Sequence, residues 1–259
     1  MGIRLKIPKN HVRADSLKKR ELVIAGEEKG IVAKAGLIAH GRGEAYDYLI
    51  GEVTTPSALF ATKAAAAALL LASHPVISIN GNTAALVPRE MVRLAKAIPA
   101  GLEVNLFYRN ARRENAVKSA LMKAGANEVL GVGSDAASVI PELFSERRRV
   151  DPRGIFSSDV VLVPLEDGDR TMALKGMRKF VITIDLNPLS RTAQSADITI
   201  VDNIMRAAPN LIKAVGELKQ VEPSELRLIV SRFDNRKSLA ESLDHICDRL
   251  SRLAKESQG

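Results

Sequence analysis

Short apolar runs recur through the middle of the chain, and none alternates cleanly with polar residues. These runs of strand length cover residues 76–79, 103–107, 128–130, 160–163, 180–184 and 198–201. Strands that are buried on both faces have this composition, because helices cover both sides of a parallel sheet. The pattern therefore predicts a mostly parallel sheet with helices on both faces.

Helical patterns lie between several of these runs, over residues 88–97, 112–124 and 171–178. Strands that alternate with helices are typical of a doubly wound, Rossmann-like α/β fold. We expect this core to extend over about residues 74–219, within a single domain that occupies residues 1–259.

The first 73 residues are predicted to form a helical arm. A helix begins at the capping residues 15–16 and ends near Glu28. Residues 35–43 contain three glycines, which predict a loop with a sharply bent backbone. A long helix rich in alanine and leucine follows over residues 56–73.

Residues 220–259 are predicted to form a helical C-terminal region. Apolar residues recur there at spacings of four and three, as Leu239, Leu243, Ile246, Leu250 and Leu253. A stripe of this kind packs a helix on its own domain or on a second subunit. Both interpretations remain open from the sequence.

The composition is that of an ordinary globular protein, with 46% hydrophobic residues among 259. No run reaches the roughly 20 apolar residues that span a bilayer. The first residues lack the apolar stretch of a secretion signal, and the lone Cys247 cannot form an internal disulfide. These observations predict a cytoplasmic protein without membrane contact.

The formal net charge of +8 is concentrated near the N-terminus, where residues 1–42 hold ten basic and four acidic side chains. A basic segment favours anionic partners, which are phosphorylated metabolites, nucleotides or nucleic acid. Proteins that bind single-stranded nucleic acid stack bases on aromatic side chains. Aromatic residues make up only 3% of this chain, so we expect small anionic ligands and no nucleic acid.

Polar side chains follow most of the predicted strands, and in an open parallel sheet ligands bind beyond the carboxyl ends of the strands. Each such segment also has an ordinary interpretation as a turn or a helix cap. Their gathering at one edge of one sheet predicts an active site. The segments are residues 80–83, 108–109, 164–170, 185–192 and 202–203.

Three acidic residues, Glu166, Asp167 and Asp169, follow one of these strands. Carboxylate oxygens are preferred ligands of Mg²⁺, but acidic residues equally cap the helix that follows. The metal ligands therefore stay undetermined at this stage. The four histidines have no metal-binding spacing, so we expect no zinc site.

Residues 131–136 match the G-x-G-x-x-A fingerprint of dinucleotide-binding proteins. They follow the third predicted strand and precede a long irregular segment, residues 133–157, so we interpret them as a turn. A dehydrogenase remains an alternative on this motif, as does a nucleic-acid-binding protein on the basic N-terminal segment. No P-loop motif occurs.

Three long strings resemble the signatures of the archaeal phosphopantothenate synthetases, also called 4-phosphopantoate–β-alanine ligases. They are AKAGLIAHGRGEA at residues 33–45, VPLEDGDR at residues 163–170, and FVITIDLNPLSRTAQSADITIVDN at residues 180–203. The resemblance covers nearly the whole chain and weakens over residues 111–153 and beyond about residue 220.

The resemblance implies a homodimeric, Rossmann-like ligase of coenzyme A biosynthesis. Such an enzyme condenses 4-phosphopantoate with β-alanine, using ATP and Mg²⁺, through an acyl adenylate, and releases 4′-phosphopantothenate, AMP and pyrophosphate. By this similarity the ATP contacts fall on Arg20, Arg42, Asp185, Leu186, Asn187, Arg191, Thr192, Asn203 and Ile204.

The chemistry suits these residue types, because guanidinium groups offset the repulsion between a carboxylate and the α-phosphate of ATP. The phosphate of the acid substrate requires a second cationic pocket. We assign it to Lys34, His40 and Arg109, with the backbone of Asn80, Gly81, Asn82 and Thr83. Glu44 or His40 is the candidate acceptor of the proton from the β-alanine amine.

Overall fold

The arrangement of the elements comes from a computed structural model, which describes residues 8, 11, 13–141, 143–165 and 167–257. The first helices are α1 (Ala14–Glu28), α2 (Lys34–Ile50) and α3 (Pro56–Leu71). The large sheet contains β1 (Pro75–Ile79), β2 (Gly101–Val104), β5 (Val160–Pro164), β6 (Phe180–Ile184) and β7 (Ile198–Ile200). The other helices are α4 (Gly81–Leu86), α5 (Pro88–Ala97), α6 (Ala111–Lys123), α7 (Gly168–Gly176), α8 (Arg191–Ser195), α9 (Ile204–Leu218), α10 (Pro223–Ser231) and α11 (Asn235–Glu256).

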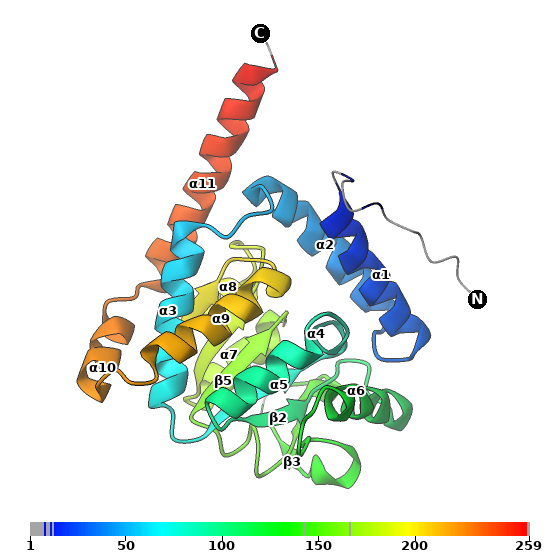
Figure 1. The fold of residues 1–259 in the computed structure, drawn as a ribbon. Helices are drawn as coiled ribbons and strands as arrows, with labels where there is room; N and C mark the ends of the chain where they lie inside the picture. The colour runs from blue at the N-terminus through cyan, green and yellow to red at the C-terminus, as the bar shows by residue number, and fades with distance from the viewer. Residues whose placement is uncertain (1–7, 9–10, 12, 142, 166, 258–259) are drawn as a thin grey trace.

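The five strands are parallel and lie in the order β2-β1-β5-β6-β7. This confirms the predicted α/β class with a parallel sheet (Figure 1). From β1 the chain crosses to the edge strand β2, and it later returns to place β5 on the other side of β1. The winding direction therefore reverses between β1 and β5, which is where open α/β sheets bind their ligands.

Side chains alternate between the two faces of the sheet, and both faces are covered. Ile77 and Leu162 pack in the main core with residues of α3, α5 and α9, whereas their neighbours Val76 and Val161 pack in a second cluster with Leu174 of α7. Burial on both faces explains why the strands are apolar throughout.

Two predicted strands differ from the structure. β2 ends at Val104, three residues before the end of the predicted run, and Leu130 forms only an isolated bridge with Glu103. The segment predicted to be irregular contains a small antiparallel pair, β3 (Ser138–Val139) with β4 (Arg149–Val150), and the 3₁₀ turns η1 (Gly133–Asp135) and η2 (Glu146–Arg148). The apolar residues of this segment complete the second core cluster.

The prediction of a loop over residues 35–43 was wrong, because helix α2 runs through all of them. None of the three glycines has a positive φ. A methyl group on Gly36 would overlap Asn82 Oδ1 and would lie 2.7 Å from Val32 Cγ1. This glycine therefore allows a helix to approach its neighbours closely, and it does not bend the backbone.

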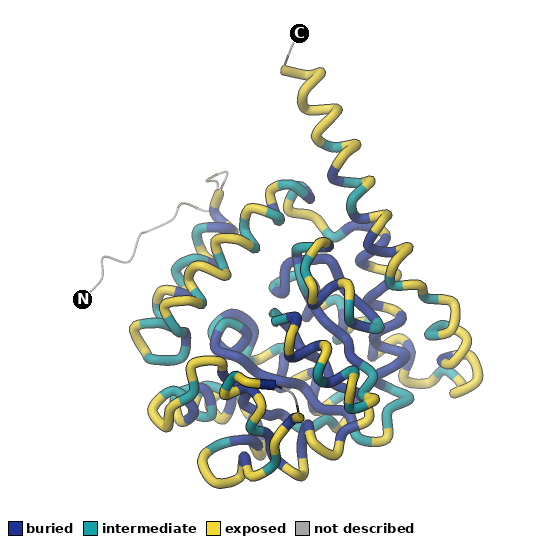
Figure 2. Tube along the Cα trace, turned by 180° about the vertical axis from the view of Figure 1, so that it is seen from behind, coloured by how far each residue is buried: buried dark blue, intermediate teal, exposed yellow. Residues whose placement is uncertain are grey.

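The C-terminal stripe is only partly covered. Leu239 and Ile246 are buried, whereas Leu250 and Leu253 are 43% and 39% exposed. The second half of α11 projects from the body of the protein (Figures 1 and 2). Across the described ranges, no helix combines the length and apolar composition that a membrane crossing requires.

Candidate active site

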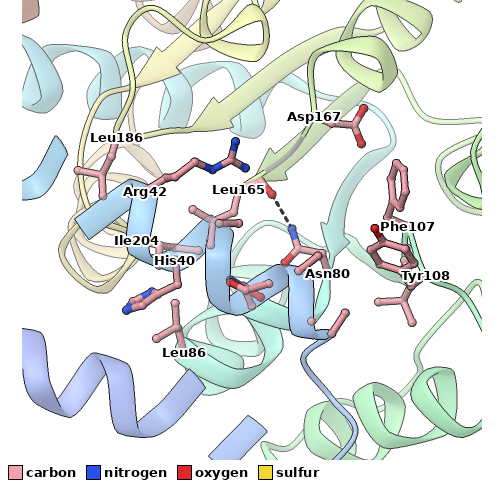
Figure 3. Close-up of a pocket in the computed structure, with 18 of the residues that line it drawn as sticks. His40, Arg42, Asn80, Leu86, Phe107, Tyr108, Leu165, Asp167, Leu186 and Ile204 are labelled. Carbon is pink, nitrogen blue, oxygen red and sulfur yellow. Dashed lines mark hydrogen bonds between the residues drawn. The ribbon is translucent and has the colours of Figure 1, made fainter. Parts of the chain in front are cut away.

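A cavity of about 330 Å³ lies between α2 and the carboxyl ends of β1 and β5 (Figure 3). Nine of the residues predicted to bind ATP or the acid substrate, or to accept a proton, line it: His40, Arg42, Glu44, Asn80, Gly81, Asn82, Leu186, Asn203 and Ile204. The other eight predicted residues, Arg20, Lys34, Thr83, Arg109, Asp185, Asn187, Arg191 and Thr192, lie outside the lining. The expected gathering of polar segments at one edge of the sheet is thus observed for the strand ends of β1, β5, β6 and β7.

Asn80 joins the two strands at which the winding reverses. Its Nδ2 donates to the carbonyl oxygens of Pro164 and Leu165, at 2.8 and 3.0 Å, and its Oδ1 accepts from the backbone N–H of Thr83. Asn82 then donates to the carbonyl of Gly36 at 2.9 Å. These bonds fix the floor of the cavity and attach helix α2 to it.

His40 faces the cavity from α2 (Figure 3). Its Nε2 is buried and has no hydrogen-bond partner among the described residues. Burial lowers the pKa of His40 below its usual value, and the nearby cations Lys19 and Arg20 lower it further against the opposing effect of Glu44. The imidazole is therefore neutral at pH 7 and can accept a proton or a hydrogen bond.

Glu44 is already engaged in the structure. Arg20 holds its carboxylate through a two-pronged contact, with Nε–Oε2 and Nη2–Oε1 distances of 2.8 Å, and the hydroxyl of Tyr48 donates to it as well. Burial alone would raise the pKa of Glu44, but these hydrogen bonds outweigh it and lower the pKa. A carboxylate stabilised in this way is a poor proton acceptor.

The segments that follow β6 and β7 contribute three of the residues implied to contact ATP to the cavity lining, Leu186, Asn203 and Ile204. Asp185 organises the loop that follows β6, because it accepts hydrogen bonds from the Ser190 hydroxyl and the Asn187 N–H. Burial raises the pKa of Asp185, and these bonds and Arg42 oppose the rise. Arg191 is exposed and pairs with Asp169 at 3.0 Å, so its guanidinium lies outside the cavity.

A buried ionic cluster, which we call the Asp47 cluster, was not predicted. Asp47 on α2 pairs with Lys19 of α1 at 3.2 Å and with Arg206 of α9 at 2.5 Å. The same carboxylate accepts a hydrogen bond from Asn203 at 2.8 Å, and Arg206 also pairs with Asp202 at 2.6 Å. The cluster positions the pocket residue Asn203 and joins the N-terminal helices to the core.

Arg109 does not face the cavity. Its side chain is 3% exposed and pairs with Glu114, and its terminal nitrogens donate to the carbonyls of Arg149 and Gly131. Lys34 is exposed at the first turn of α2. The structure therefore does not bring these two cations to the pocket with His40.

Two other arginines line the cavity, and sequence reasoning missed both. Arg113 comes from the first turn of α6, and Arg147 comes from the 3₁₀ turn η2. Arg147 lies in a run of charged residues, which is typical of a solvated surface, yet it is only 9% exposed. Only the strand order indicates that the segments of Arg113 and Arg147 lie beyond the ends of the strands.

The carboxylates that were candidates for Mg²⁺ have other partners. Asp167 caps α7 through the N–H of Arg170 and pairs with Arg147 at 3.3 Å, and Asp169 pairs with Arg191. Glu166 lies outside the described residues. Among those that are described, no three acidic, histidine or cysteine side chains group as metal ligands.

The motif at residues 131–136 ends in the short 3₁₀ turn η1 (Gly133–Asp135) and does not open an α-helix. The dinucleotide fingerprint requires a helix at that point. The structure thus supports its interpretation as a turn.

Fold and pocket together define a doubly wound α/β protein with a cavity at its switch point that Arg42, Arg113 and Arg147 line. Residues 57–249 match the family model described as phosphopantothenate/pantothenate synthetase, and the chain belongs to this family. It is 57% identical to a protein of Thermococcus kodakarensis, over 96% of this chain and 95% of that protein, and 51% identical to one of Methanosarcina mazei, over 97% and 98%. A protein of Methanospirillum hungatei is 46% identical, over 94% and 98%. All three relatives are named 4-phosphopantoate–β-alanine ligase.

Proposed function

We propose that this chain is an ATP-dependent, AMP-forming ligase that condenses 4-phosphopantoate with β-alanine to give 4′-phosphopantothenate. The observation that carries the proposal is a cavity at the switch point of the sheet that is lined by arginines from three segments and by a neutral histidine. Two anionic substrates that react with each other need this distribution of charge. The names of the relatives support the same reaction.

In this proposal the nucleotide occupies the wall formed by Arg42, Leu186 and Ile204, with the loop after β6. Arg42 offsets the repulsion between the substrate carboxylate and the α-phosphate, and attack of the carboxylate on the α-phosphorus releases pyrophosphate. Mg²⁺ bound to the nucleotide phosphates would offset charge on the departing pyrophosphate. This fits the engaged carboxylates of the site, because Mg²⁺ in such sites is held largely by phosphate and water oxygens.

The amine of β-alanine then attacks the acyl carbon of the adenylate, and AMP leaves. We assign proton acceptance from the amine to His40, whose imidazole is neutral and whose Nε2 forms no hydrogen bond within the part of the chain that the structure describes. His40→Gln should lower kcat by about tenfold to a hundredfold, in the range of general-base contributions, with little change in the KM for ATP. Turnover equal to that of the wild type would remove His40 from this role.

One pair of assays tests the reaction itself. Purified protein with ATP, Mg²⁺, 4-phosphopantoate and β-alanine should release AMP and pyrophosphate. With β-alanine omitted, labelled pyrophosphate should enter ATP only when 4-phosphopantoate is present, which reports the adenylate. Release of ADP and phosphate would replace the adenylate with an acyl phosphate and would contradict the proposal.

We also propose that the chain functions as a homodimer in which the exposed half of α11 pairs with a second copy. Leu250 and Leu253 continue the stripe of the buried Leu239 and Ile246 beyond the protein's own core. Leu250→Asp with Leu253→Asp should reduce the mass measured by light scattering from that of two chains to that of one. Lys255→Asp, near the end of the same helix, serves as the control. A dimeric double variant would contradict this assignment.

A further inference from the structure

Arg113 is a partly buried cation that no carboxylate neutralises within the part of the chain that the structure describes. Its Nη2 donates to the carbonyl of Ile31 at 3.1 Å, and its Nη1 donates to the carbonyl of Tyr108. Its Nε is buried, and no described residue forms a hydrogen bond with it. Two backbone carbonyls fix the orientation of the guanidinium without cancelling its charge.

Arg147 adds a second guanidinium to the same side of the cavity. Its Nε lies 3.3 Å from Asp167 Oδ2, and its guanidinium carbon lies 6.0 Å from the centre of the Phe107 ring. Asp167 and the ring hold the side chain in place. Phe107 and Tyr108 mark this end of the cavity, opposite Arg42 and Leu186 (Figure 3).

The two arginines repel each other. Burial lowers the pKa of Arg113. Burial, together with the charges of Arg170 and Arg113, lowers the pKa of Arg147 to about 10 against the opposing effect of Asp167. Both side chains stay cationic at pH 7, so two positive charges lie at the same end of the cavity. A dianion bound there would relieve this repulsion and accept charge-assisted hydrogen bonds.

The wall between the two ends of the cavity is apolar. Leu86 and Leu165 line it beside His40 and Asn80 (Figure 3). In 4-phosphopantoate a carbon bearing two methyl groups separates the phosphate from the carboxylate. A ligand with its phosphate at the arginine pair would therefore set its methyl groups against the leucines and direct its carboxylate towards Arg42.

We propose that Arg113 and Arg147 bind the phosphate of the acid substrate and make the enzyme select the phosphorylated acid over free pantoate. This assignment rests on the proposed ligase function, and it replaces Arg109 and Lys34 in the cationic pocket expected from the sequence.

The test is steady-state kinetics of Arg113→Gln and Arg147→Gln with both acids. Each variant should raise the KM for 4-phosphopantoate by about tenfold to a hundredfold, the worth of hydrogen bonds to a charged group. The KM for ATP and the rate with unphosphorylated pantoate at high concentration should stay within about twofold of the wild type. The preference for the phosphorylated acid should therefore collapse.

Matched controls come from the neighbouring residues Arg112 and Arg148, which are exposed on the same segments. Arg112→Gln and Arg148→Gln should keep the wild-type preference. Arg113→Lys, which retains the charge without the forked geometry, should lie between Arg113→Gln and the wild type. It serves as the test if the glutamine variant does not fold.

Three outcomes would overturn the assignment. An increase confined to the KM for ATP would place the nucleotide phosphates at this pair, and equal losses with both acids would place the carboxylate there. Unchanged selectivity in both variants would leave the pair without a role in substrate choice. Failure of the ligase function itself gives a different result, because the wild type would then release no AMP with either acid.

Discussion

The Asp47 cluster and the Arg113–Arg147 pair use the same types of side chain for opposite purposes. In the cluster, Asp47 and Asp202 meet Lys19 and Arg206, so that cations and anions alternate in a buried network. At the pair, Arg147 contacts Asp167, whereas Arg113 donates to the backbone carbonyls of Ile31 and Tyr108. Within the described residues, the cations of the cluster are paired with carboxylates, whereas Arg113 has no carboxylate partner beside the cavity.

This difference separates a structural role from a binding role. Hydrogen bonds in the Asp47 cluster join α1, α2 and α9, so a change there should appear in stability. At the arginine pair, Arg113 carries a charge that no carboxylate among the described residues neutralises, so a change there should appear mainly in ligand binding. Buried charges of one sign beside a cavity therefore indicate a binding site more specifically than buried charges that pair with each other.

The largest effect is expected at Asp47. Asp47→Ala leaves the charges of Lys19 and Arg206 without their shared partner, and removal of one member of a buried ion pair costs about 3–5 kcal/mol. Unfolding in urea, followed by circular dichroism, should show this loss. Asp15→Ala, which removes an exposed pair with Lys18, should change stability by less than about 0.5 kcal/mol. A similar result for both variants would contradict the structural role of the cluster.

Two buried carboxylates, Glu103 and Asp47, should make the stability of the protein depend on pH in opposite directions. Burial raises the pKa of Glu103, on β2, to about 7, although the N–H groups of Ile155 and Asp151 and the charge of Arg170 oppose the rise. The folded protein then binds more protons than the unfolded chain between about pH 4.5 and 7, so this group lowers stability as pH rises through that range. Relative to Glu103→Gln, the wild type should lose about 2 kcal/mol between pH 5 and 8.

Asp47 should act in the opposite direction. Burial would raise its pKa, but Arg206, Lys19 and Asn203 outweigh burial and lower it. Its stabilising contribution is present above the unfolded pKa, near 4, and is lost as pH falls through the lower folded pKa. Glu128→Gln, at an exposed surface pair, serves as the control for both carboxylates. Parallel pH profiles of Glu103→Gln and the wild type would exclude an ionising Glu103.

Inorganic phosphate should distinguish the two charge arrangements without a substrate. If it binds at the arginine pair, phosphate at ten times its Kd should stabilise the wild type by about 1.4 kcal/mol. Thermal unfolding should detect the shift, and Arg113→Gln should reduce it. Arg112→Gln should retain it. An equal shift in Arg113→Gln would place the anion elsewhere.

The smallest effect concerns the glycines of α2. A methyl group on Gly41 meets nothing within 4 Å, so Gly41→Ala should stabilise the protein by about 0.5–1 kcal/mol through helix propensity. Gly36→Ala should lower activity, because its methyl group would push α2 away from Asn82. Thermal unfolding and turnover of the two variants test this contrast. Equal behaviour of both would contradict the close approach at Gly36.

Apolar runs were sufficient to predict most of the sheet and its class. Val76 and Phe180 belong to continuous apolar runs because both faces of these strands are buried. Such a run predicts a strand from the local sequence alone, whichever elements pack against it. The prediction of a loop over residues 35–43 was wrong for a physical reason. Helix propensity accounts for the cost of a glycine in a helix, but it does not include the close contact with Asn82 that requires a glycine at residue 36.

The candidate site was predicted in part for a similar reason. His40, Arg42 and Asn80 follow from strings and strand ends that are local in the sequence. The position of Arg147 depends on how the segment between β2 and β5 folds over the edge of the sheet. Within this run of charged residues, Arg147 lines the cavity whereas Arg148 is exposed. Arg109 follows the apolar run of β2, but Glu114 and two carbonyls draw its guanidinium into the interior.

Helix α2 faces the cavity with small residues. Gly36, Ala39 and Gly43 line the cavity, so the backbone of this helix approaches a ligand more closely than longer side chains would allow. A methyl group on Gly43 would lie 3.6 Å from Leu186 Cδ1, at the end of the cavity that we assign to the nucleotide. Larger residues at this position would therefore narrow the space for the nucleotide and leave the arginine pair at the opposite end untouched.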